Sequence, residues 1–161
     1  MASQSNSGYL DGEALLALLR EQTAEGRRVR GIPFRGVSMM PLLRQGVDTV
    51  EAGPLPQRLK KMDLPIYRMP SGKILMHRVV ADKGDYYLCN GDNMLTFEEV
   101  PHEDMIALVT AVIRGGKRIP VTALSYRLYS ALWHYGRPLR HLYRRVKSAG
   151  GRLLRRMGLR K

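Results

Sequence analysis

Hydrophobic and polar positions change their period three times along the chain. In residues 11–29, "DGEALLALLREQTAEGRRV", leucines recur at the spacing of an amphipathic helix, and Asp11 stands where a cap is expected. Between residues 31 and 121 the apolar runs shorten to strand length. From Thr122 leucines again recur every four residues. This pattern predicts an N-terminal helix, a β region and a C-terminal helical segment.

The β region alternates apolar runs with turn-rich pieces. The runs are "DTVEA", "LPIYRM", "KILMHRVV", "YYLCN", "MIALVTAVI" and "KRIPV". Glycine-containing pieces such as "KGD" and "RGGK" separate them at hairpin spacing. We therefore expect a mainly β, antiparallel fold. The expected domains are a helix over 1–30, the β domain over 31–121 and a basic helical tail over 122–161.

Composition narrows the chemistry. With 161 residues the chain can bury one modest core, and its one cysteine, Cys89, excludes an internal disulfide and a Cys-based zinc site. The remaining candidates for metal ligands, His102, His134 and His141, lack ligand spacing, so we expect no metal and no cofactor. We find neither a secretory signal pattern at the start nor a run of about eighteen apolar residues. The expected location is the cytoplasm, with or without peripheral attachment to a membrane.

The net charge of +13 is carried by the last third of the chain. Residues 105–161 contain fourteen Lys and Arg and no acidic residue, whereas residues 1–104 are close to neutral. Three interpretations of 122–161 stay open. Its apolar stripe packs on the β domain, or it binds an anionic membrane surface, where Trp and Leu insert beside the cations. Nucleic acid ranks last, because no nucleic-acid-binding motif accompanies the charge.

A serine in "FRGVSMMPLL" and a histidine in "LMHRVV" are the candidate reactive groups. Ser38 alone indicates little, since serines in turns commonly cap helices or bind their own backbone. A nucleophilic serine, however, needs a fixed turn whose N–H groups face a developing oxyanion. His77 suits the role of base because imidazole titrates near neutral pH. Its alternative is an ordinary strand histidine, either solvent-facing or satisfied in the core.

Four segments together resemble a known family. "GVSMMPLL", "KKMDLPIYR", "ILMHRVV" and "YYLCNGDN" are similar, in order, to the conserved boxes of type I signal peptidases and of the LexA-like self-cleaving repressors. The resemblance covers roughly residues 30–114. It implies the antiparallel β fold of that family and a serine endopeptidase activity. Histidine in the third box, where many relatives carry lysine, resembles the histidine-type branch.

The resemblance also implies the site. Ser38 is the expected nucleophile, His77 the general base and Asp92 the acid that orients the histidine. Asp92 has a structural alternative, because Asn-Gly-Asp-Asn is good turn chemistry by itself. Some histidine-type relatives place the acid about six residues later, which makes Glu98, beside Glu99, the substitute.

Other matched positions are structural or differ from the family pattern. Asp48 and Asp63 match acidic positions that begin strands. Val47 is inserted where Gly-Asp is usual, and Met62 replaces a glycine. Gly36 stands where some relatives carry a second serine of the oxyanion hole, so this hole depends on backbone N–H groups, chiefly that of Ser38.

The expected reaction is the removal of a leader, signal or propeptide from a protein or peptide precursor, which binds as an extended strand. The family prefers small residues at the first and third positions before the cut. Typical signal peptidases also have a membrane anchor. Residues 11–29 do not match such an anchor, because their pattern is that of an amphipathic helix and not of a membrane-spanning one. Two alternatives remain. One is a LexA-like regulator that cuts itself, although no DNA-binding domain is recognised before residue 30. The other is an inactive relative that binds peptides or membranes.

Overall fold

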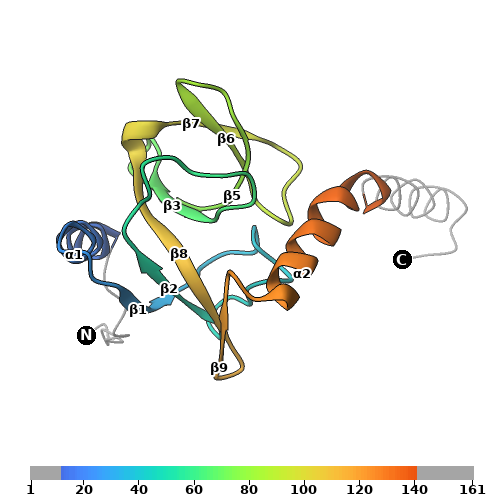
Figure 1. Ribbon diagram of the computed structural model, residues 1–161, viewed down its shortest axis with the longest axis horizontal. Helices are drawn as coiled ribbons and strands as arrows, with labels where there is room; N and C mark the ends of the chain where they lie inside the picture. Colours follow the sequence, from blue (N-terminus) through green and yellow to red (C-terminus); the bar gives the residue numbers. More distant parts are fainter. Residues whose placement is uncertain (1–11, 141–161) are drawn as a thin grey trace, which may run out of the picture.

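Residues 12–140 are described by this computed structural model, and they form a mainly β fold with a helix on either side (Figure 1). The expectation of antiparallel sheets with an N-terminal and a C-terminal helix is confirmed. The helices are α1 (Gly12–Ala24) and α2 (Leu124–Tyr135), with a 3-10 turn, η1, at His102–Asp104. The strands are β1 (Val29–Pro33), β2 (Thr49–Gly53), β3 (Pro65–Arg68), β4 (Ile74–Met76), β5 (Arg78–Asp82), β6 (Tyr86–Asn90), β7 (Glu98–Pro101), β8 (Met105–Arg114) and β9 (Lys117–Pro120).

The strands form two separate antiparallel sheets. The larger has the order β1-β2-β8-β3-β4, with β9 also paired to β8, and the smaller has the order β5-β6-β7. The ten-residue β8 organises the larger sheet, because it pairs with β2, β3 and β9. Strands β1 and β4 are therefore the two ends of this strand order.

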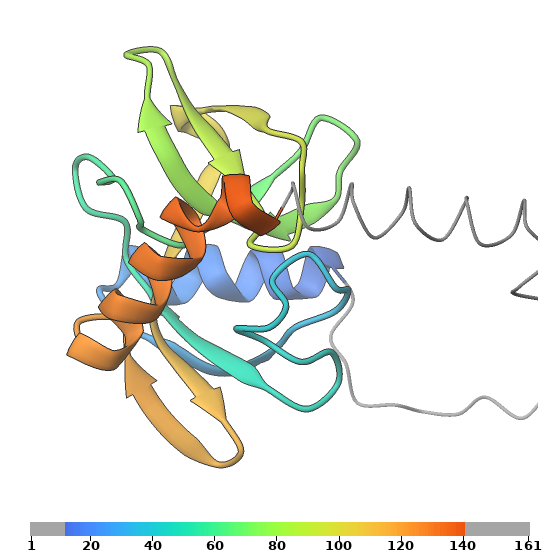
Figure 2. The ribbon, with the colours of Figure 1, turned by 90° about the vertical axis from the view of Figure 1, so that its right-hand side faces the viewer.

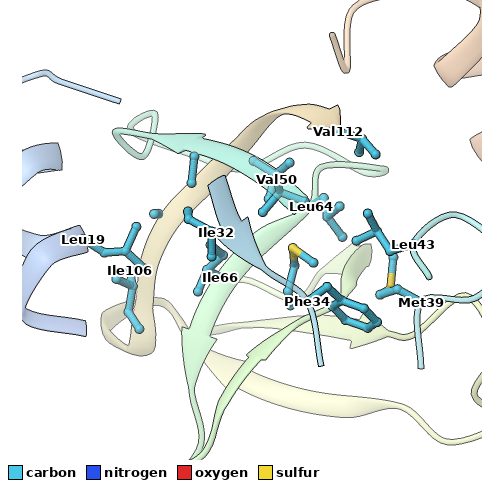
Figure 3. Close-up of a cluster of buried hydrophobic side chains, with 14 of the residues drawn as sticks. Leu19, Ile32, Phe34, Met39, Leu43, Val50, Leu64, Ile66, Ile106 and Val112 are labelled. Carbon is cyan, nitrogen blue, oxygen red and sulfur yellow. The ribbon is translucent and has the colours of Figure 1, made fainter. Parts of the chain in front are cut away.

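The main core joins α1 to the larger sheet and also takes in the turn after β1 and Tyr126 of α2. Leu16 and Leu19 of α1 join apolar side chains of the sheet, among them Val50 and Ile106 (Figure 3). The helix ends at Ala24, earlier than its leucine pattern predicts, because Gly26 adopts a positive φ of 73° and its N–H bonds Thr23 O. β1 then crosses the expected domain boundary after residue 30, and α1 packs in the same core as the sheet.

Turn chemistry places the hairpins where the sequence predicts them. β5 and β6 are joined across "KGD", and β8 and β9 across the two glycines of "RGGK", where Arg114 pairs with Lys117. Gly115 and Gly116 have φ values of 55° and 78°, which suit a two-residue hairpin turn.

The run "KILMHRVV" differs most from its expected form. It is not one strand, because His77 stands between β4 of the larger sheet and β5 of the smaller sheet. The break turns the chain from one sheet to the other and buries His77, which is 3% exposed. The strands β1 and β7 are not among the predicted runs, since "VRGIP" and "EEVP" have few apolar residues.

Helix α2 lies across the β strands from α1 (Figures 1 and 2). The first interpretation of the tail, an apolar stripe packed on the β domain, is wrong for this helix. Leu124, Leu128 and Leu132 are exposed, and Tyr126 and Ser130 are the buried residues. The reason is the guanidinium of Arg78, which is buried under α2 and donates hydrogen bonds to Tyr126 and Ser130. Residues 141–161 lie outside the described part of the chain.

Candidate active site

Ser38 lies in a turn that follows β1 and is held by buried neighbours. Phe34 and Met39, on either side of it, are in the main core together with Leu43 (Figure 3). The turn is closed by Met40 N–H, which bonds Val37 O at 3.2 Å, and by Leu43 N–H, which bonds Met39 O at 3.1 Å. Ser38 itself is half-buried. The packing therefore fixes the backbone of Ser38 and leaves its side chain accessible.

The "NGDN" loop is bonded to this turn. Asn93 N–H donates to Ser38 O at 2.7 Å, and the Asn93 side chain donates to Val37 O at 3.1 Å. Gly91 brings the segments together, because a Cβ there would stand 2.8 Å from Ser38 O and 3.2 Å from His77 Cδ2. Any larger residue at Gly91 would push apart the serine turn and the histidine ring.

His77 binds a carboxylate, and that carboxylate belongs to Glu98. His77 Nδ1 lies 2.6 Å from Glu98 Oε2, at the start of β7. An Nδ1–H that donates to Glu98 leaves Nε2 as the ring acceptor. The Cδ2 atom next to Nε2 faces Gly91, the neighbour of Ser38 O. The free nitrogen is therefore on the side of the ring near the serine turn.

Tyr67 is a partner that the sequence reasoning did not single out. Its hydroxyl on β3 donates to Glu98 Oε2 and lies 3.1 Å from His77 Nδ1. Burial, followed by the charge and hydrogen bond of Glu98, raises the pKa of Tyr67, so the phenol keeps its proton. Two donors thus converge on one carboxylate oxygen. The only sequence signal for Tyr67 is its place in "PIYR", which resembles the second box.

Asp92, the acid expected to orient His77, binds Arg78 instead. Its two oxygens accept from Arg78 Nε and Nη2, both at 2.9 Å, in a pair that is almost fully buried. Arg78 Nη1 donates to Tyr126 and Ser130 of α2 at 3.2 and 3.0 Å. Trp133 of α2 donates to Asp92 O at 2.8 Å. Asp92 therefore ties the "NGDN" loop and α2 to the strand that follows His77.

A cavity of about 420 Å³ brings Ser38 and His77 to one surface. Its other walls are mostly apolar and come from α1, β1, β2, β3 and β4. They are Gly12, Leu15, Ile32, Pro33, Phe34, Arg35, Val50, Ile66, Ile74, Leu75 and Met76. Within residues 12–140 no hydrogen bond engages the Ser38 hydroxyl or its backbone N–H. Both groups are thus available to a ligand in the cavity.

The remaining candidates lie away from this cavity. Asp48 closes a turn by accepting from Arg44 N–H at 2.8 Å and from the Arg44 side chain, which lowers the pKa of Asp48. Asp63 closes another turn by accepting from Lys60 N–H. His102 stacks on Tyr87, and His141 lies outside the described residues. Among residues 12–140 no group of three His, Cys, Asp or Glu side chains could hold a metal ion.

Comparison with protein-family models, with curated proteins and with solved structures finds no match to this chain. Within the described residues, neither helix has the length and apolar character needed to cross a bilayer.

Proposed function

We propose that this chain is a serine endopeptidase of the signal-peptidase and LexA-like kind, which removes a leader, signal or propeptide from a precursor. The observation that carries the proposal is the shared cavity: Ser38 and His77 line it together, and Glu98 holds the far nitrogen of His77 at 2.6 Å. A serine, a buried imidazole and an orienting carboxylate are the groups that acyl transfer requires.

In the proposed mechanism His77 acts first as a base and then as an acid in each half-reaction. His77 Nε2 takes the proton from Ser38 Oγ while Oγ bonds to the peptide carbonyl carbon. The backbone N–H of Ser38 faces the developing oxyanion. The C–N bond then breaks, and the leaving amine receives the proton from His77. Water, deprotonated by His77, cleaves the ester and restores Ser38. Glu98 takes the role that was expected of Asp92: it fixes the tautomer of His77 and stabilises the imidazolium.

The substrate fits as an extended strand between β1 and β4. These two strands end the order of the larger sheet, and both line the cavity through Ile32, Pro33, Ile74 and Met76. Edge strands of a sheet offer unpaired backbone N–H and C=O groups, to which an extended peptide can add as a further strand. The apolar walls then receive side chains of the residues before the cut.

The test is mass-spectrometric profiling of a peptide library in which the first and third positions before the cut vary between alanine and leucine. The wild type should cleave a subset of peptides. Ser38→Ala and His77→Ala should each lower the rate on the order of 10³-fold or more. Ser71→Ala, an exposed serine, and His102→Ala, the histidine stacked on Tyr87, are matched controls that should keep the wild-type rate.

Cleavage by Ser38→Ala at the wild-type rate would refute the proposal. A loss of intact mass by the protein alone, at a rate independent of its concentration and abolished in Ser38→Ala, would favour the self-cleaving alternative. Peptide binding that is equal in the wild type and Ser38→Ala, without cleavage by either, would favour the inactive relative.

A further inference from the structure

The outer face of α2 carries an exposed row of leucines. Leu124, Leu128 and Leu132 are 70%, 54% and 74% exposed, and Tyr135 and Leu139 continue the row. Residues four apart lie above one another on a helix, so these side chains form one continuous stripe. A single exposed leucine is ordinary, whereas an aligned row marks a contact surface.

The inner face of α2 prevents the helix from turning this stripe inwards. Tyr126 and Ser130 are buried and accept hydrogen bonds from Arg78 Nη1. Rotation that buried the leucines would remove both acceptors from a buried guanidinium and break the bond from Trp133 to Asp92 O. The leucines are therefore exposed because the fold holds them so.

Cations border the stripe. Arg127, on α2, is exposed, whereas Arg137 and Arg140, after the helix, stack on Phe97 and Trp133 and face away from the leucines. Lys61 reaches the end of the stripe, where its Nζ lies 5.0 Å from the centre of the Tyr135 ring. From residue 105 to 161 the sequence supplies fourteen basic residues and no acidic one.

This charge selects the occupant. A second copy of the chain would oppose like charges, since each carries +13 overall. Nucleic acid would satisfy the cations and leave the leucines in water. A bilayer with anionic headgroups satisfies both, because the cations meet the headgroups while the leucines enter the acyl boundary.

We propose that the outer face of α2, together with Arg127 and Lys61 beside it, binds the surface of an anionic lipid bilayer. Such binding is interfacial and needs no spanning segment. It would hold the Ser38–His77 cavity near the membrane, because the inner face of α2 is bonded to the Asp92 loop. The proposal is independent of the peptidase activity, since lipid binding is measured without a substrate.

The experiment is co-sedimentation of the full-length protein with vesicles of phosphatidylcholine alone or with about one third phosphatidylglycerol. We expect binding to be at least about tenfold stronger with the anionic lipid and to weaken as salt is raised.

The variant Leu124→Gln/Leu128→Gln/Leu132→Gln, in which glutamine keeps a helix propensity close to that of leucine, should lower the affinity for anionic vesicles at least about tenfold. Val47→Ser, an apolar residue 63% exposed in a turn before β2, is the matched control and should bind as the wild type does. Melting curves without lipid should coincide for all three proteins, because these side chains are exposed.

Three results would overturn the proposal. Equal binding of the wild type and the triple variant would show that the leucines do not contact lipid. Equal binding to neutral and anionic vesicles would remove the role of the cations. A dimer that the triple variant abolishes, or a melting temperature that it lowers without lipid, would show that protein, from a second copy or from residues 141–161, covers the stripe.

Discussion

Glu98 and Asp92 are two carboxylates six residues apart that contact neighbouring residues of the chain: half-buried Glu98 contacts His77, and buried Asp92 contacts Arg78. Glu98 lies within hydrogen-bond distance of the His77 ring and accepts from the Tyr67 hydroxyl. Asp92 accepts from the guanidinium of Arg78, with both oxygens in use. Burial acts to lower the pKa of Arg78, but Tyr126 and Asp92 outweigh it and raise this pKa, so the group stays charged.

The difference separates chemistry from architecture. A carboxylate that faces an imidazole can stabilise a charge that appears during a reaction and disappears afterwards. A carboxylate that faces a permanent cation is already neutralised and holds that cation in place. We therefore infer that Glu98 serves the reaction and that Asp92 serves the fold. The predictions below test this division.

The largest expected effect is on catalysis in Glu98→Gln. The amide keeps the size of the side chain but removes the charge that stabilises the imidazolium, so kcat should fall on the order of 10²–10⁴-fold. Stability should change little, because Glu98 is partly exposed. Steady-state rates on the best library peptide, with urea unfolding alongside, measure both. An unchanged kcat would show that Glu98 does not serve the reaction.

Asp92→Asn should show the reverse pattern. Arg78 stays charged and loses its counter-charge in a buried site, which should cost about 3–5 kcal/mol of unfolding free energy. The rate of the molecules that remain folded should stay within about tenfold of the wild type. Urea unfolding and activity normalised to the folded fraction measure the two quantities.

An exposed ion pair provides the control for Asp92→Asn. Asp82 also binds an arginine through both oxygens, but its partner Arg58 is 61% exposed. Asp82→Asn should therefore lower the free energy of unfolding much less than Asp92→Asn does. In the buried site, Arg78→Met/Asp92→Leu removes both charges and should recover part of the lost stability. If Asp92→Asn costs no more than Asp82→Asn, the architectural role of Asp92 is wrong.

The sequence predicted the strands better than it predicted the contacts made by the candidate site residues. Apolar runs of strand length and glycine turns are local features, so they identify most of the β region. Ser38 and His77 were found because their neighbours resemble four boxes in order. The structure brings both to one cavity, and it brings Glu98, the weighed substitute, to His77.

Contacts between distant segments could not be predicted. Arg78 follows His77 directly, but nothing in "HRVV" shows that its guanidinium is buried under a helix that begins almost fifty residues later. That contact decides the orientation of α2. The spacing of the leucines alone predicts that they face the core. The buried guanidinium of Arg78, however, needs polar partners, so Tyr126 and Ser130 face inwards and the leucines are exposed. The same contact explains why Glu98, and not Asp92, lies at His77: both oxygens of Asp92 bind Arg78.

Tyr67→Phe should have a smaller effect. The change removes one of the two donors on Glu98 Oε2 and keeps the ring in the core. We expect kcat to fall about tenfold and unfolding free energy to fall by about 1 kcal/mol. Because Tyr67 positions Glu98 rather than touching the substrate, KM should stay within about twofold. A matched control is Tyr87→Phe, whose hydroxyl bonds Leu59 N and lies outside the cavity lining, and which should affect stability alone. Equal kcat in wild type and Tyr67→Phe would remove Tyr67 from the site.

The smallest expected effect is on the pH dependence of stability and concerns Cys89. This residue of β6 pairs with Glu98 of β7 and so lies beside Glu98, not beside Asp92. Burial, followed by the charge of Glu98, raises the pKa of the thiol from its ordinary 9.0 to about 12. Above pH 9 the unfolded chain loses this proton before the folded protein does, so folding stability falls as pH rises through this range and levels off near pH 12. By pH 10 the loss from this group should be about 1 kcal/mol.

In Cys89→Ala the decline of stability between pH 8 and pH 10, measured by urea unfolding, should therefore be shallower by that amount. Glu98→Gln should reduce the decline less, because the carboxylate is the second cause, whereas Asp92→Asn should leave it unchanged. An identical decline in wild type and Cys89→Ala would show that the thiol does not stay protonated beside Glu98.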